Sequence, residues 1–121
     1  MHKTNPQRFV IEVTTTTAGA ATVYSPLIYG AVWQIHYIKA GSGGFSDGVD
    51  FAITAEQTGQ GLWTEDNVNA SKVVAPRQAS HNQVGSAQSA LVPIVLGNDR
   101  VKIVITNGGS ETDGTFVVVA G

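Results

Sequence analysis

Hydrophobic and polar residues alternate along most of the chain with the period of two that is typical of β-strands. Residues 49–56 are the clearest case. One face of the expected strand carries Val49, Phe51, Ile53 and Ala55, and the other carries mainly polar residues. The pattern predicts a strand with one buried face, followed by a Gly-rich turn at 56–61 and a short aromatic strand at 62–64.

The same period predicts further strands at 9–17, 21–25, 31–40, 72–75, 91–96, 100–106 and 115–120. Both faces of the 31–40 strand are partly apolar, so we expect it to be central, with Trp33, Ile35 and Tyr37 sharing one face. Pro93 places the 91–96 strand at an edge or a bulge. The last two strands are expected to form the final hairpin.

Two polar segments lack this alternation. Residues 77–90 consist of small residues and amides, which predicts a long functional or disordered loop, with a short helix over 84–90 as the alternative. Residues 1–8 precede the first strand and are expected to form an N-terminal arm. Such an arm is either a disordered terminus or a segment that reaches a neighbouring subunit.

Seven to nine expected strands without a helical period predict an all-β fold. The length of 121 residues fits one domain, which we place at 9–121. We expect a single-domain antiparallel β-sandwich, with a small β-barrel as the alternative.

Charged residues make up 13% of the chain, about half the usual share of roughly 25%. A surface of neutral side chains loses little free energy when another protein covers it, which favours assembly.

The net charge of −2 predicts no nucleic-acid partner. The chain has no cysteine, and it has neither an apolar run long enough for a membrane span nor the apolar stretch of a signal peptide, so no membrane partner is expected.

The sequence offers no arrangement of residues that predicts catalysis. The three histidines lack the spacing of metal ligands, and no serine lies in a nucleophile-elbow motif. Glu65 and Asp66 are adjacent on a strand, so they point in opposite directions and would not flank one glycosidic bond. Asp47 and Asp50 are expected to cap turns rather than to bind calcium. We therefore predict no enzyme activity, no cofactor and no metal site.

Candidate contacts with a partner protein lie mainly in the arm and in the polar 77–90 segment. Trp63 is a further candidate, because with a tyrosine it would make an aromatic platform for a sugar ring, although core packing is the commoner fate of such a residue. The candidate residues are Arg8, Arg77, His81, Asn82, Gln83 and Trp63.

Three stretches carry a likeness to a known group of proteins: VTTTTAGAATVYSP, FSDGVDFAITAEQTGQGLWTEDNVNAS and NDRVKIVITNGGSETDGTFVVVAG. They cover most of residues 13–121, and the segments DGVDF and LWTE are the most distinctive. Together they resemble small structural proteins of tailed bacteriophages. The resemblance implies no catalytic residues.

The resemblance implies a virion protein, assembled in the bacterial cytoplasm, that decorates the head as a minor capsid protein. Its expected partners are the major capsid protein and further copies of itself in a small symmetric homo-oligomer. The alternative is a tail-associated or carbohydrate-binding β module.

Overall fold

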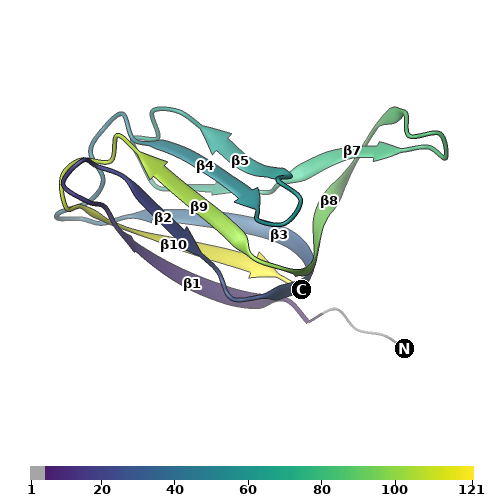
Figure 1. Cartoon of the computed structure of the whole chain (residues 1–121), viewed down its shortest axis with the longest axis horizontal. Coiled ribbons are helices and arrows are strands. Elements are labelled where there is room, and N and C mark those ends of the chain that lie inside the picture. Colours follow the sequence, from purple (N-terminus) through teal and green to yellow (C-terminus); the bar gives the residue numbers. More distant parts are fainter. Residues whose placement is uncertain (1–4) are drawn as a thin grey trace.

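A computed structural model describes residues 5–121, which form ten β-strands and no helix (Figure 1). No helix among these residues could therefore cross a membrane. In chain order the strands are β1 (Gln7–Thr14), β2 (Ala21–Tyr24), β3 (Ile28–Lys39), β4 (Asp50–Ala55), β5 (Gly61–Glu65), β6 (Lys72–Val74), β7 (Arg77–His81), β8 (Ala87–Asp99), β9 (Val101–Thr106) and β10 (Asp113–Ala120).

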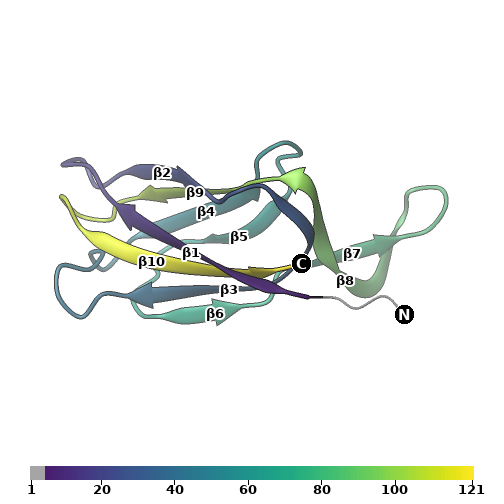
Figure 2. The same ribbon diagram turned by 90° about the horizontal axis from the view of Figure 1, so that it is seen from below.

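The strands form two antiparallel sheets that pack face to face (Figure 2). Sheet A has the order β1-β10-β3-β8-β7, and β6 also pairs with β3; sheet B has the order β2-β9-β4-β5. Neither sheet closes on itself. The predicted β-sandwich is confirmed, and the barrel alternative is wrong.

The core between the sheets is built around a cluster of aromatic rings. Phe51 from β4 lies at its centre, with ring centroids 4.8 Å from Tyr37, 5.0 Å from Phe116 and 5.2 Å from Trp63. The predicted alternation in β4 is confirmed, because the side chains predicted to share its inner face are all buried. Offset and edge-to-face ring packing of this kind stabilises a core beyond its buried area.

The expected faces of β3 are wrong at Val32 and Trp33, before the register shift, and correct at Ile35 and Tyr37 after it. Val32 and Ile35 both face the core, and Trp33 lies between them as the extra residue where the pairing of β3 with β10 shifts register. Trp33 instead donates a hydrogen bond from Nε1 to the carbonyl oxygen of Gly121, at 2.9 Å. A bulge of this kind reverses the alternation of the side chains that follow it.

The expected final hairpin is also wrong. β9 lies in sheet B between β2 and β4, whereas β10 lies in sheet A between β1 and β3. Residues 107–112 therefore cross from one sheet to the other. Each of the two strands has an inner face of β-branched or aromatic side chains, and the two faces meet in the core instead of sharing a sheet.

The 77–90 segment is neither a loop nor a helix. Its ends belong to β7 and β8, which pair with each other from Arg77 opposite Pro93 to His81 opposite Ala87. The N-terminal boundary shifts as well, because β1 begins at Gln7 and Arg8 pairs with Val119. Part of the expected arm, residues 1–4, lies outside the described residues.

Removal of one buried hydroxyl should stabilise the fold. The Tyr37 hydroxyl is buried and has no hydrogen-bond partner within residues 5–121, and burial raises the pKa of the phenol. A buried polar group without a partner costs about 1–3 kcal/mol. We expect Tyr37→Phe to increase the free energy of unfolding by about 1 kcal/mol in urea denaturation. Tyr29→Phe, in an exposed ring, is the control and should change nothing; a loss of stability in Tyr37→Phe would contradict the assignment.

Candidate functional site

The most distinctive surface feature is the hairpin of residues 77–93, here called the hairpin arm, which extends beyond the end of the sandwich (Figures 1 and 2). Its turn is held by Asn82. The side-chain Oδ1 of Asn82 accepts hydrogen bonds from the backbone N–H groups of Val84 and Ser86, at 3.1 and 3.0 Å. Gly85 has a φ of +81°, a conformation that glycine adopts without strain. The amide at position 82 and the glycine at 85 thus define the tip.

Beyond Arg77, its first residue, the hairpin arm is neutral and largely exposed. Residues 78–98 contain no Asp, Glu, Lys or Arg. Val84 at the tip is 85% exposed, and Leu91 and Val92 on β8 are also exposed. β3 pairs with β8 only over Ile94–Asp99, so within residues 5–121 the outer half of β8 has β7 as its single neighbour. Both edges of the hairpin arm therefore present backbone groups that another chain can pair with.

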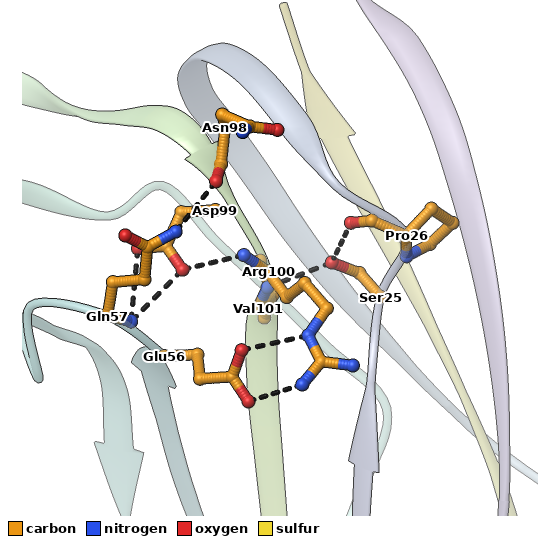
Figure 3. A network of polar contacts seen from close by, with 8 residues as sticks. All are labelled: Ser25, Pro26, Glu56, Gln57, Asn98, Asp99, Arg100 and Val101. Carbon is orange, nitrogen blue, oxygen red and sulfur yellow. Dashed lines mark hydrogen bonds and ion pairs between the residues drawn. The ribbon is translucent and has the colours of Figure 1, made fainter.

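The end of β8 that lies in sheet A is fixed by its last residue, Asp99 (Figure 3). Its carboxylate is buried and accepts hydrogen bonds from the backbone N–H groups of Gln57, at 3.0 Å, and Arg100, at 2.7 Å. The Gln57 side chain in turn donates from Nε2 to the carbonyl oxygen of Asn98, at 2.8 Å. These bonds tie the end of β8 to the turn between β4 and β5.

An ion pair continues the network on the outside of sheet B (Figure 3). The Arg100 guanidinium donates two hydrogen bonds to the Glu56 carboxylate, one of them from Nε at 2.8 Å, and lies 4.2 Å from the centre of the Tyr24 ring. The hydrogen bond from Arg100 lowers the pKa of Glu56, and the same bond raises the pKa of Arg100. The two side chains are partly exposed to solvent, 39% for Arg100 and 32% for Glu56, so water screens their attraction.

Ser25 joins the segment between β2 and β3 to the start of β9, beside Asp99 and Arg100. Its Oγ donates to the carbonyl oxygen of Pro26 and accepts from the backbone N–H of Val101, both at 2.8 Å (Figure 3). The backbone of Ser25 also donates to the carbonyl oxygen of Val101, at 2.9 Å. Three connecting segments thus meet at the end of β8, the strand that the hairpin arm shares with sheet A.

Four of the predicted contact residues belong to this feature. Arg77 begins β7 and donates from Nη1 to the carbonyl oxygen of Pro76, at 2.7 Å. His81 ends β7, and Asn82 and Gln83 follow in the turn, all of them exposed. Arg8 lies apart from them, on β1 at the opposite edge of sheet A.

Trp63 does not fit the predicted contact role. Its side chain is 7% exposed and packs edge-on against Phe51 in the core, and its Nε1 donates to the Glu65 carboxylate at 3.0 Å. That hydrogen bond and a stronger one from Lys72 lower the pKa of Glu65. The buried ring is not available as a platform for a sugar, so Trp63 no longer supports the carbohydrate-binding alternative.

The rest of the described chain offers little for chemistry. Within residues 5–121 no group of three or more His, Asp or Glu side chains could hold a metal ion. Asp50 caps turns as predicted, because its carboxylate accepts from the Asn67 backbone N–H and from the Asn107 side chain, at 3.0 and 2.8 Å. A hollow of about 230 Å³ beside the starts of β1 and β3 and the end of β10 is lined by Asn5, Gln7, Phe9, Leu27, Ile28, Tyr29, Ala120 and Gly121. Its lining contains no acid, base or nucleophile.

Two parts of this site, the turn at the tip and the role of Asp99, were not predicted from the sequence. The turn at the tip has a recognisable signal, since an asparagine followed three residues later by glycine is a common turn pattern. The role of Asp99 has no local signal, because its partner Gln57 lies far away in the sequence.

Comparisons with known proteins do not assign the chain to a family. No protein-family model matches the chain, and no curated protein matches it. Among solved structures, the crystal structure of FLHE aligns with 97% of this chain and 98% of its own at 10% identity, with a TM-score of 0.47. Nothing about function follows from a similarity of that size.

Loss of the Asp99 carboxylate should destabilise the fold at the end of β8. Asp99→Ala leaves the partly buried N–H groups of Gln57 and Arg100 without this acceptor. We expect the free energy of unfolding in urea to fall by about 2 kcal/mol. Asp99→Asn keeps one acceptor oxygen and should lose less; equal losses in the two variants would show that the hydrogen bonds contribute nothing.

The Glu56–Arg100 pair should make stability depend on acid pH. The pKa of Glu56 is lower in the folded chain than its ordinary value of 4.5, which the unfolded chain keeps. The ionised carboxylate therefore stabilises the fold at pH values above 4.5, and this contribution is lost as the pH falls through the pKa of the folded chain. We expect Glu56→Gln to show a shallower loss of stability than the wild type between about pH 5 and pH 3 in thermal denaturation. Asp66→Asn, at an exposed position outside every ion pair formed within residues 5–121, is the control. Identical pH profiles for Glu56→Gln and the wild type would contradict this role.

Proposed function

We propose that the chain is a structural protein of a bacteriophage virion that binds and stabilises the surface of the head as a symmetric oligomer. The observation that carries the proposal is the neutral hairpin arm, which projects from a rigid β-sandwich. The sequence resemblance to small phage structural proteins supports the same role. The major capsid protein is the proposed partner.

The physics of the hairpin arm fits a docking element. A two-stranded hairpin alone is at best marginally stable in water, so an arm with Leu91, Val92 and Val84 exposed gains stability when a partner covers it. Residues 78–98 carry no charged side chain, so a partner that covers them does not have to remove water from a charge. A capsid protein that offers a strand edge would pair with the free edges of β7 or β8.

The anchored end of β8 serves the same purpose. Asp99 and Ser25 hold the end of β8 against two neighbouring segments, so the strand that the hairpin arm shares is fixed in the sandwich before a partner binds. A repeating capsid lattice then multiplies a weak single contact through avidity when the bound protein is an oligomer.

Purified virions of the phage that encodes the chain provide the test. We expect quantitative mass spectrometry to find the chain in many copies per particle, and fractionation to find it with heads. Absence from the particle, or only a handful of copies, would overturn the proposal. Recovery with isolated tails would favour the tail-associated alternative.

A variant of the hairpin arm tests the contact itself. Val84→Asp places a charge at the exposed tip and should not alter folding, because the side chain is 85% exposed. We expect its binding to heads that lack the chain to fall about tenfold or more, since burial of an uncompensated charge is costly. Ser42→Asp, exposed in the loop after β3, is the matched control and should bind like the wild type. Unchanged binding of Val84→Asp would remove the tip from the contact.

A further inference from the structure

The outward face of sheet A carries an ordered row of side chains. Strand pairing places Val10 opposite Val117, Val117 opposite His36, and His36 opposite Val73. Residues directly opposite each other in a sheet point to the same side, so these four form one row across the sheet. Figure 2 shows the four strands of the row, β1, β10, β3 and β6, side by side in this order. We call it the central row.

The central row is apolar at both ends although it faces away from the core. Val10 is 61% exposed and Val73 is 49% exposed. Val117 is 2% exposed but is not part of the core cluster, because Val10 and His36 flank it on the outer face. Apolar side chains gathered on an open sheet face commonly mark a surface that another protein covers.

Two opposite charges flank the row on the same face. Arg8 and Glu12 lie two residues before and two residues after Val10 on β1, and both are exposed. They are four residues apart on one strand, or about 13 Å, which is too far for them to pair with each other. None of the ion pairs formed within residues 5–121 includes either residue.

From this pattern we infer that the face is a self-association surface: two copies pack sheet A against sheet A, related by a two-fold axis along the central row. Rotation about that axis sets each residue of the row over its counterpart and exchanges the two flanks. Arg8 of each copy then lies opposite Glu12 of the other, which gives two equivalent ion pairs. Paired sheets of this kind lie about 10 Å apart.

The charges of Arg8 and Glu12 distinguish this arrangement from a second one, in which the two-fold axis runs parallel to the strands. A two-fold axis parallel to the strands would place β1 over β6 of the second copy. β6 contributes Val73 to this face, and its neighbour Lys72 is already bonded to Glu65. That arrangement would leave Arg8 without an acid opposite it on β6. A different kind of partner would need its own opposite charges, whereas a second copy supplies both.

This inference names the contact for the self-association within the proposed function, and it rests on that part of the proposal alone. It can be tested on the purified full chain without any virion. A monomer in solution would therefore overturn the inference and leave the capsid contact of the hairpin arm to be judged separately.

Charge reversal on β1 provides a sharp test by sedimentation equilibrium. The wild type should be a dimer at high micromolar concentration. Arg8→Glu and Glu12→Arg each place like charges opposite each other twice per dimer, so each should raise the dimer dissociation constant about tenfold. The double variant R8E/E12R restores both pairs and should regain the affinity of the wild type. An equimolar mixture of the two single variants should form heterodimers, because one chain then carries two acids and the other two arginines.

Asp66→Arg is the matched control, since it makes the same change of charge at an exposed position outside this face. It should leave the dimer unchanged. Val10→Asp should abolish the dimer. A monomeric wild type, a dimer unaffected by Val10→Asp, or a double variant as weak as the single ones would each overturn the inference.

Discussion

The pairing along one edge of β3 determines the shape of the molecule. Residues 28–32 of β3 pair with the second half of β8, and residues 35–37 pair with β6. The chain between β6 and the paired half of β8 has no place left beside β3. It must therefore leave the sheet, and it does so as a hairpin. Pro76 and Pro93 stand at the two points of departure, and neither has an N–H to donate to a sheet ladder.

The same arrangement divides the surface into two regions with different chemistry. The hairpin arm is neutral, and its exposed side chains and free strand edges suit contact with another protein. The outer face of sheet A combines an apolar row with one basic and one acidic flank, which suits contact with itself. A decoration protein on a lattice needs both kinds of contact, one to the capsid and one between its own copies. The two surfaces lie on different strands, so both contacts can be made at once.

Periodicity predicted the elements whose two faces differ. β4 is the best case, since Phe51 and Ile53 face the core and the intervening residues do not. It failed in β3, because the extra residue Trp33 shifts the alternation. It also failed in the hairpin arm, where both faces are exposed and small residues such as Ala79 and Ser80 need not alternate. The crossing between β9 and β10 depends on which sheet each strand joins, and no local pattern encodes that choice. For the candidate site, the polar composition of 77–90 distinguishes this segment in the sequence, but its hairpin structure and the role of Asp99 depend on distant contacts.

A density map of the intact virion would test the central claim most directly. It should show the sandwich on the outside of the head, with residues 77–93 against the major capsid protein and with the sheet A faces of two copies in contact. Density for the chain on the tail, or on the head with the hairpin arm pointing into solvent, would contradict the account.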